Sequence, residues 1–342
     1  MISFLIVREM IRLTASRGIL LDRPNERSSH ATPTPRGGGL AIALVVLVGT
    51  GLLWRPDGVM GWRGIVAFLL GAGLIAVVGW IDDLRSLGSL TRLLVHIVGA
   101  LAIVGLVGYW RAVEIPVLGG LGLGEFGIPL SLVWITASTN IYNFMDGIDG
   151  LAGSQAICAG IGWLIVGLAS GQDPIVWLSI LLISSALGFL LHNWPPARIF
   201  MGDVASGFLG FAFGSMAVMG AQYDARYAVA GILFIWPFVF DGSYTILRRL
   251  RNRENVFTAH RSHLYQRLVA SGLSHRTVTI MYASGALVCV AATWVWLFRP
   301  GADLVPVGTA LLTAVGPLWL VRSRETARVT IDTISQMQAK EG

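Results

Sequence analysis

The chain has 342 residues, of which 54% are hydrophobic and only 13% are charged, and its mean hydropathy is +0.69. These values exclude an ordinary soluble domain and are typical of a polytopic membrane protein. The net charge is +6, but the basic residues are spread over short loops, so no nucleic-acid partner is predicted. Cys158 and Cys289 both lie within apolar runs, which predicts small buried side chains and no disulfide framework.

Apolar runs long enough to cross about 30 Å of hydrocarbon recur along the chain. Residues 1–21 are a poor candidate, because Arg8, Glu9 and Arg12 interrupt the run; they predict a short or truncated first span or an interfacial helix. The fold class is therefore an all-α polytopic membrane protein with about 10–11 transmembrane helices. The clear spans are predicted at 38–54, 63–81, 93–110, 129–145, 151–170, 174–192, 205–222, 227–247, 277–298 and 303–321.

Two segments depart from this pattern of spans. Residues 113–130 are rich in glycine and predict an external hairpin on the face opposite the polar loops described below. Residues after Leu320 carry scattered charge without an apolar run, which predicts a short cytoplasmic helix or disorder. The sequence thus indicates one integral membrane domain at 1–321 and a cytoplasmic tail at 322–342.

The arginines are distributed unevenly between the two sides of the membrane. If the first segment crosses, most of them fall in loops on one side, which the positive-inside rule places in the cytoplasm. Four polar stretches, at 81–92, 143–150, 192–203 and 248–268, follow alternate spans and share that face. Such a basic face can contact anionic lipid headgroups and anionic substrates. Charges at span ends, and not at the midplane, favour an enzyme of the cytoplasmic face over a transporter.

Acidic residues occur in the first and third of these four polar stretches. Asp82 and Asp83 directly follow an apolar span. They fit a solvated turn, but paired carboxylates can also bind a divalent metal ion or supply a general base. Asp203 follows a glycine at the start of a run of small residues. It fits either a helix cap or a metal ligand, with the N–H groups of the next turn facing a phosphate.

The stretch NIYNFMDGIDGLAG, at 140–153, places Asn140, Asn143 and Asp146 three residues apart. On a helix they form one polar stripe in an otherwise apolar span. The glycines that follow predict a turn that carries Asp149. Hydrogen bonding between helices is a structural alternative, but Asn and Asp oxygens are also ligands suited to Mg²⁺ or Mn²⁺.

The stretch FTAHRSHLYQRL, at 257–268, places His260 and His263 among Arg261 and Arg267. No cysteine or acid completes a zinc site at suitable spacing, so we interpret these residues as a diphosphate-binding group.

Two further residues have weaker signals. Arg36 precedes three glycines, which resembles the approach of a backbone to an anion. Asp241, near the end of an apolar span, fits a helix-end ion pair with Arg248 and Arg249 as well as it fits catalysis.

Taken together, the motifs resemble the polyprenyl-phosphate N-acetylhexosamine-1-phosphate transferases, the superfamily of WecA, MraY and TagO, and within it the WbpL-like branch. The matching stretches run from residue 22 to residue 268 in the order of the family. They are DRPNERSSHATPTPRGGGLAI, GWIDDLRSLGSLTRLLVH, NIYNFMDGIDGLAG, PPARIFMGDVASGFLG and the late FDGSYTILRRL with HRSHLYQRL.

The resemblance implies a reaction at the bacterial inner membrane, with the active site facing the cytoplasm. A UDP-N-acetylhexosamine donates its sugar 1-phosphate to undecaprenyl phosphate, which yields undecaprenyl-diphosphate-sugar and UMP and initiates O-antigen or related envelope glycan synthesis. Mg²⁺, or Mn²⁺ in its place, and arginines would screen the repulsion between the two phosphate groups. Membrane lipids are the other partners, and the resemblance leaves a homodimer open.

The resemblance also assigns roles to single residues. Asp203 is implied as the principal metal ligand and Asn143 as the second, and Asp82 and Asp83 lie at the acceptor phosphate. Asp82, Asp83 and Asp203 are then the catalytic set, either for direct attack or for a covalent phospho-enzyme. The residues implied in substrate binding are Asn140, Asp146, Asp149, Arg36, Arg92, His260, Arg261, His263 and Arg267.

Departures from the family pattern bear on the sugar. Tyr265 and Gln266 replace two histidines of the usual HLHHRL, His260 replaces a nearby acid, and Ala205 replaces a glycine. The triple histidine of the MraY type is absent, which argues against a UDP-MurNAc-pentapeptide donor. An altered sugar pocket is expected, for UDP-FucNAc or UDP-QuiNAc in place of UDP-GlcNAc. The alternative function is a multi-pass transporter or flippase for a lipid-linked sugar.

Overall fold

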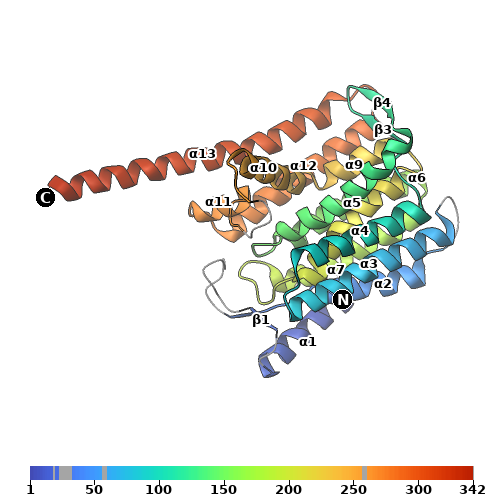
Figure 1. Ribbon diagram of the computed structural model, residues 1–342, viewed down its shortest axis with the longest axis horizontal. Coiled ribbons are helices and arrows are strands. Elements are labelled where there is room, and N and C mark those ends of the chain that lie inside the picture. The colour runs from blue at the N-terminus through green and yellow to red at the C-terminus, as the bar shows by residue number, and fades with distance from the viewer. Residues whose placement is uncertain (18–19, 23–32, 56–59, 256–259, 342) are drawn as a thin grey trace.

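The computed structural model describes residues 1–17, 20–22, 33–55, 60–255 and 260–341, which form a bundle of helices (Figure 1). The first helices are α1 (Ile2–Arg17), α2 (Leu40–Leu53), α3 (Gly61–Leu84) and α4 (Ser89–Leu106). Next come α5 (Gly127–Phe144), α6 (Leu151–Ser170), α7 (Asp173–Asn193) and α8 (Asp203–Gly220). The last are α9 (Arg226–Phe234), α10 (Trp236–Arg251), α11 (Leu264–Ala270), α12 (His275–Phe298) and α13 (Leu304–Glu341).

Strands are confined to two short antiparallel pairs. Strand β1 (Leu21–Asp22) pairs with β2 (Thr34–Pro35), and β3 (Ala112–Ile115) pairs with β4 (Gly119–Gly122), before the 3-10 turn Gly124–Phe126. The second pair confirms the glycine-rich hairpin. It lies at the end of the bundle opposite α11 (Figure 1).

The prediction of an all-α polytopic membrane protein is confirmed. Among the described residues, 7 helices are long and apolar enough to cross a membrane, namely α3, α4, α6, α7, α8, α12 and the part of α13 up to Ala327. The predicted span 227–247 is a broken pair, α9 and α10, bent by 78° where Pro237 begins the second helix. The spans predicted at 38–54 and 129–145 are α2, which has only 14 residues, and α5, whose polar stripe lowers its hydropathy.

The ends of the chain differ in part from the prediction. Helix α1 has 16 residues and packs against α7 and α2. No break separates the last span from the tail, because α13 continues as one helix to Glu341 and projects beyond the bundle (Figure 1). The boundary predicted at 321/322 is therefore not a boundary between helices.

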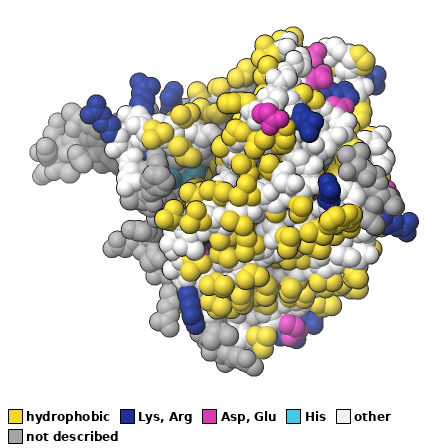
Figure 2. Space-filling model, turned by 45° about the vertical axis from the view of Figure 1, so that its right-hand side comes forward, with side chains coloured by type: hydrophobic (Ala, Val, Ile, Leu, Met, Phe, Trp, Pro, Cys, Tyr) yellow, Lys and Arg dark blue, Asp and Glu magenta, His cyan; other side chains and the backbone are white. Residues whose placement is uncertain are grey.

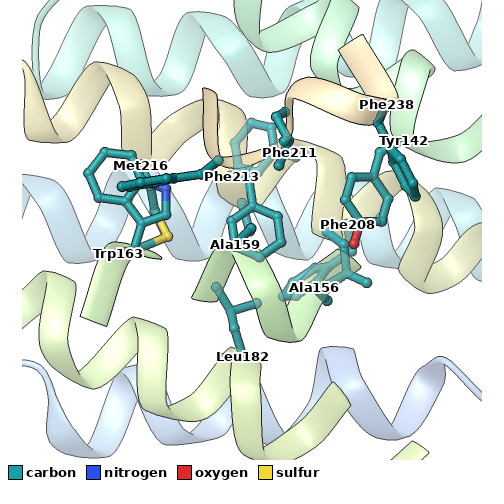
Figure 3. Close-up of a cluster of buried hydrophobic side chains, with 14 of the residues drawn as sticks. Tyr142, Ala156, Ala159, Trp163, Leu182, Phe208, Phe211, Phe213, Met216 and Phe238 are labelled. Carbon is teal, nitrogen blue, oxygen red and sulfur yellow. The ribbon is translucent and has the colours of Figure 1, made fainter. Parts of the chain in front are cut away.

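Helix α8 is the centre of the bundle. All its residues from Val204 to Gly220 are buried, and it packs most closely against α3 and α5. Phe213 of α8 stacks on Tyr142 of α5, which also contacts Phe238 of α10 (Figure 3). Trp163 of α6 lies in the same cluster and packs edge-to-face on Phe234 of α9. Dense packing of this kind leaves the first turn of α8 little freedom to move.

Apolar side chains also cover the outside of the bundle. Figure 2 shows hydrophobic side chains over most of one face of the helices. The exposed large hydrophobic residues of the helices include Leu70, Val77, Leu94, Val98 and Val133. An exposed apolar area of this extent needs a covering, and for helices of this length the hydrocarbon of a membrane supplies it.

Candidate active site

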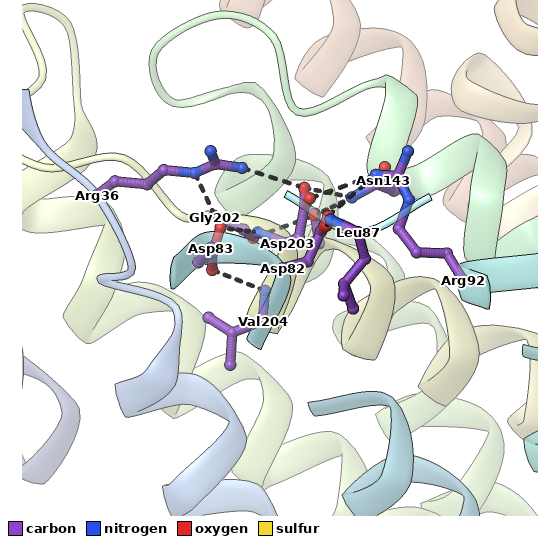
Figure 4. A network of polar contacts seen from close by, with 10 residues as sticks. Arg36, Asp82, Asp83, Leu87, Arg92, Asn143, Gly202, Asp203 and Val204 are labelled. Atoms are coloured by element: carbon purple, nitrogen blue, oxygen red, sulfur yellow. Dashed lines mark hydrogen bonds and ion pairs between the residues drawn. The ribbon is translucent and has the colours of Figure 1, made fainter. Parts of the chain in front are cut away.

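Six polar side chains from distant parts of the chain meet at one end of the bundle (Figure 4). Most of them lie at helix ends, because α3 and α5 end where α4 and α8 begin. The structure thus brings the predicted catalytic and metal-binding residues together. They are Arg36, which follows β2; Asp82 and Asp83, in the last turn of α3; Arg92, in α4; Asn143, in the last turn of α5; and Asp203, the first residue of α8.

Asp203 occupies the middle of this cluster, and its side chain is 20% exposed. Its Oδ1 accepts a hydrogen bond from Asn143 Nδ2 at 2.9 Å and lies 3.5 Å from a terminal nitrogen of Arg36. Its Oδ2 lies 3.4 Å from Arg92. The residue before α8, Gly202, has no capping side chain. The helix-cap interpretation of Asp203 is therefore wrong: its carboxylate faces two arginines and an amide.

Asp83 supplies the missing cap from another helix. Its two carboxylate oxygens accept the backbone N–H groups of Asp203 at 2.9 Å and Val204 at 3.1 Å, and Arg36 Nε lies 2.8 Å from Oδ1. The Asp83 side chain has no exposed surface. It satisfies N–H groups that a helix start leaves unpaired and fixes the first turn of α8. The solvated-turn interpretation of the pair is wrong, and contact of Asp83 with the acceptor phosphate stays a prediction.

Asp82 joins the same cluster through Arg92. The carboxylate of Asp82 accepts the backbone N–H of Leu87, and its Oδ2 lies 3.1 Å from Arg92. Arg92 therefore bridges Asp82 and Asp203, as Arg36 bridges Asp83 and Asp203. Both arginine side chains are about one-third exposed. The cluster thus presents two cations at its mouth and keeps two of its three carboxylates buried.

The close approach of α3 to α8 depends on a glycine. A Cβ atom at Gly79 would lie 2.5 Å from the backbone oxygen of Asp203 and 2.8 Å from Cα of Val204. We expect Gly79→Ala to lower the free energy of unfolding by about 2 kcal/mol and to impair activity, because α8 must move away. Gly73→Ala in the same helix is the control, since a Cβ there meets nothing within 4 Å. Thermal unfolding in detergent measures both; equal melting temperatures would contradict the prediction.

The oxygen donors of the cluster fit a magnesium ion. Magnesium prefers one or two carboxylates together with water and substrate phosphates, and Asp203 is partly exposed beside Asn143 and Asp82. Within the described part of the chain, no group of three or more His, Cys, Asp or Glu side chains is arranged as a metal site. Asp203 and Asn143 would hold such an ion, with the Asn143 amide turned so that its oxygen replaces its nitrogen.

A second group of acids lies in the loop between α5 and α6. Burial, together with the negative charge of Asp203, raises the pKa of Asp146 well above its usual value. Asp149 accepts the backbone N–H of Ala197 at 3.0 Å and lies 3.4 Å from His275 Nδ1. Asp146 therefore lies electrostatically near the cluster, whereas Asp149 ties the loop to the segment before α8 and to α12.

The raised pKa of Asp146 predicts a pH dependence of stability. The folded protein binds this proton more tightly than the unfolded chain, so the stabilisation is complete below about pH 3.9 and is lost as pH rises through the raised pKa. The slope in that window is about 1.4 kcal/mol per pH unit. Asp146→Asn should remove it, so its melting temperature should fall less than that of the wild type from about pH 5 to about pH 8. Parallel curves would count against this assignment.

The histidine loop lies against the same end of the bundle. His263 is buried and precedes α11, and its Nδ1 lies 3.2 Å from Asp241 Oδ1. The ring of His260 stacks on that of His263 at 5.1 Å. Burial and the neighbouring His263 and Arg249 lower the pKa of His260 to about 4, so at neutral pH it contributes no positive charge to a diphosphate.

The two arginines of this loop have different surroundings. Arg261 is exposed. Arg267 instead pairs with Glu325 of α13, at 2.6 and 2.9 Å, so it faces α13 in this structure. Residues 257–259 of the predicted motif lie outside the described residues, as do residues 23–32 of the first motif.

The three glycines after Arg36 pack against protein and not against an open anion site. The N–H groups of Gly38 and Gly39 donate to the backbone oxygens of Phe200 and Met201, both at 2.9 Å. These N–H groups are therefore engaged, and the predicted approach to an anion is wrong for them. Their role is to seat Arg36 against the segment before α8.

A small pocket of about 60 Å³ adjoins the cluster on the side of the spans. Its lining includes Arg92, Asn143 and Asp203 of the cluster, together with Asn140 and His96. Asn140 donates to the backbone oxygen of Thr136 at 2.7 Å. Asn140 therefore borders the cluster without bonding to Asp203.

Sequence reasoning missed several residues of this region. Ser206 accepts a hydrogen bond from Asn143 at 2.7 Å, His275 faces Asp149, and Tyr282 donates to Asp241 at 2.6 Å. Single Ser, His and Tyr residues in apolar helices give no distinctive pattern, so only tertiary packing reveals them.

The comparisons with known proteins show the family of the chain. Residues 65–221 match the family described as Glycosyl transferase family 4. A Bacillus subtilis protein, "Probable undecaprenyl-phosphate N-acetylglucosaminyl 1-phosphate transferase", is 32% identical over 85% of this chain and 82% of its own length. The decaprenyl-phosphate N-acetylglucosaminephosphotransferase of Mycolicibacterium smegmatis is 30% identical over 89% of this chain and 82% of its own.

A third relative extends the comparison to another donor class. The phospho-N-acetylmuramoyl-pentapeptide-transferase of Symbiobacterium thermophilum is 31% identical over 85% of this chain and 90% of its own length. Similar identity thus extends to relatives whose names specify different sugars. The chain belongs to the superfamily of polyprenyl-phosphate N-acetylhexosamine-1-phosphate transferases.

Proposed function

We propose that the protein transfers N-acetylhexosamine 1-phosphate from a UDP-sugar to undecaprenyl phosphate. An oxygen of the lipid phosphate attacks the phosphorus atom attached to the sugar. The new P–O–P bond forms as the bond to the bridging oxygen breaks, and UMP leaves with that electron pair. The observation that supports this proposal most directly is the position of Asp203, which lies partly exposed between Arg36, Arg92 and Asn143.

The residues of the cluster have different roles in this reaction. Arg36 and Arg92 screen the repulsion between the two phosphate groups and stabilise the charge on the leaving UMP. Asp83 fixes the backbone at Asp203, and the two arginines orient the carboxylate of Asp203. Mg²⁺, held by Asp203 and Asn143, would supply further charge neutralisation at the phosphates. The ion pair of Asp82 with Arg92 supports a role for Asp82 beside the acceptor phosphate.

The position of the cluster suits a lipid acceptor and a soluble donor. It lies at an end of the spans, and the excess of arginines in the loops on that side supports a cytoplasmic site at the bacterial inner membrane. The proposed product starts an O-antigen or a related envelope glycan. The replacement of two usual histidines by Tyr265 and Gln266 supports a sugar other than GlcNAc, with UDP-FucNAc and UDP-QuiNAc first in order.

Release of UMP tests the proposal. Purified protein in detergent receives undecaprenyl phosphate, Mg²⁺ and one of UDP-GlcNAc, UDP-FucNAc and UDP-QuiNAc. UMP release that requires both lipid and Mg²⁺ supports the transferase and identifies the donor. Equal or better use of UDP-GlcNAc overturns the sugar assignment. Absence of release with every donor, together with binding of intact lipid-linked sugar, supports the alternative of a transporter or flippase.

A further inference from the structure

A second buried aspartate, Asp241, lies outside the cluster around Asp203. It belongs to α10, and it is 0% exposed. Its oxygens accept five hydrogen bonds, which is more than the roughly four lone-pair sites of a carboxylate, so no acceptor site is left unused. The donors are His263 Nδ1 at 3.2 Å, Leu264 N at 2.9 Å, Thr245 Oγ1 at 3.2 Å, Tyr265 N at 3.0 Å and Tyr282 Oη at 2.6 Å.

Two of these donors are the first backbone N–H groups of α11. This helix has only 7 residues, and so short a helix does not persist without tertiary support. Asp241 caps it from α10, as Asp83 caps α8 from α3. In both places a buried aspartate of one helix fixes the start of another, and a residue implied in substrate handling, His263 or Asp203, stands at that start.

The bond to His263 also sets the chemistry of its ring. A carboxylate only accepts hydrogen bonds, so Nδ1 must carry the proton that it donates to Asp241. Nε2 is then the nitrogen that can serve a ligand, either as an acceptor or, when protonated, as a cationic donor. A buried carboxylate behind a histidine is a known way to fix both its tautomer and its orientation.

Helix α11 is joined in turn to the loop after α5. Tyr265 Oη donates to the backbone oxygen of Phe144 at 3.0 Å, next to Asn143. A Cβ atom at Gly147 would lie 2.0 Å from the same hydroxyl, so the tyrosine packs directly on this loop. Asp241 therefore fixes His263 relative to the loop of Asn143 and Asp146, and not merely relative to α10.

We propose that Asp241 is a positioning residue for the nucleotide-sugar side of the site. It holds α11 and the ring of His263 in the arrangement that receives the diphosphate of the donor. This inference rests on the proposed function. The residue touches no substrate itself, so its effect passes through His263 and should appear in the use of the UDP-sugar and not in the use of the lipid.

The first test compares Asp241→Asn with the wild type and with Asp303→Asn. Asp303 is the matched control, because it accepts one hydrogen bond from Trp296 outside both aspartate clusters. Asp241→Asn should raise the KM for the UDP-sugar about 10-fold, because a change of that size corresponds to the loss of about one charge-assisted hydrogen bond. The KM for undecaprenyl phosphate should stay unchanged. Hydrogen exchange of the peptide that covers residues 263–270 should accelerate in this variant alone.

A double-mutant cycle separates positioning from general stability. If Asp241 acts through His263, Asp241→Asn should have little further effect on the KM of the UDP-sugar in a His263→Ala background. Additive effects, an unchanged KM, or unchanged exchange at 263–270 would each overturn the proposal. If Asp241→Asn does not fold, Tyr282→Phe keeps the carboxylate and removes the 2.6 Å bond; it should change the same quantities in the same direction by about 2-fold to 3-fold.

The exchange measurement keeps the two proposals distinct. A wild-type protein that turns over no donor would overturn the proposed function and leave the exchange result intact. Faster exchange at 263–270 in the variant would then still show that Asp241 holds α11. Unchanged exchange beside an active wild type would overturn the positioning role alone.

Discussion

Replacement of Asp203 by asparagine should lower the kcat/KM of sugar-phosphate transfer by about 10³-fold, or about 4 kcal/mol of transition-state stabilisation. Asp203 is the one carboxylate of the described cluster that both Arg36 and Arg92 approach, and it also accepts the amide of Asn143. An asparagine keeps the shape and loses the charge, so the two guanidinium groups lose their common partner and a metal ion loses its main ligand.

The matched control for this substitution is Asp173→Asn. Asp173 and Asp203 are both the first residues of long helices, so any effect of an acid on the helix dipole is shared. Asp173 is exposed and belongs to α7, away from the cluster. We expect it to retain wild-type activity and melting temperature. Activity of Asp203→Asn within about 3-fold of wild type would contradict the assigned role.

Asp83→Ala should be the most destabilising substitution in the site. It removes the acceptor of two N–H groups at the start of α8 and the partner of Arg36, and the side chain of Asp83 is fully buried. Breaking a buried pair costs about 3–5 kcal/mol, and the value here should be near the lower limit, about 3 kcal/mol, because Arg36 is one-third exposed. Activity should fall as well, because Asp203 loses its anchor.

Thermal and denaturant unfolding in detergent measure the first effect. Asp83→Asn should lie between wild type and Asp83→Ala, since one amide oxygen can accept at most part of what two carboxylate oxygens accept. Asp303→Ala is the control for a shortened aspartate elsewhere. A melting temperature of Asp83→Ala equal to that of the control would show that α8 does not depend on this cap.

The spans could be predicted because apolar length is a property of the sequence itself. The break between α9 and α10 was missed, although the Trp-Pro-Phe run at 236–238 carries a signal for a helix start in the proline. The apolar run at 38–54 also did not reveal that its helix, α2, has only 14 residues and is shorter than the other spans.

The members of the site could be predicted better than their roles. Asp82, Asp83, Asn143 and Asp203 stand out as polar residues in apolar surroundings, and they do meet. The capping of α8 by Asp83 could not be foreseen, because it depends on the packing of α3 against α8, which local spacing does not encode.

The same limit applies to the late loop. The sequence around Arg267 predicts a contact with phosphate, yet Arg267 forms an ion pair with Glu325, which is 58 residues away in the sequence. The ion pair with Arg248 and Arg249 was one of two interpretations of Asp241. Asp241 instead contacts α11, and Arg249 pairs with Glu254 at 3.5 Å.

Product analysis with a doubly labelled donor tests the central claim most directly. The UDP-sugar carries one label in the sugar and a second in the phosphate attached to it, and the lipid product is separated after reaction with undecaprenyl phosphate. The account predicts that both labels reach the lipid together, in equal amounts, while unlabelled UMP is released. Sugar label on the lipid without the phosphate label, accompanied by UDP, would show transfer of the sugar alone and would contradict it.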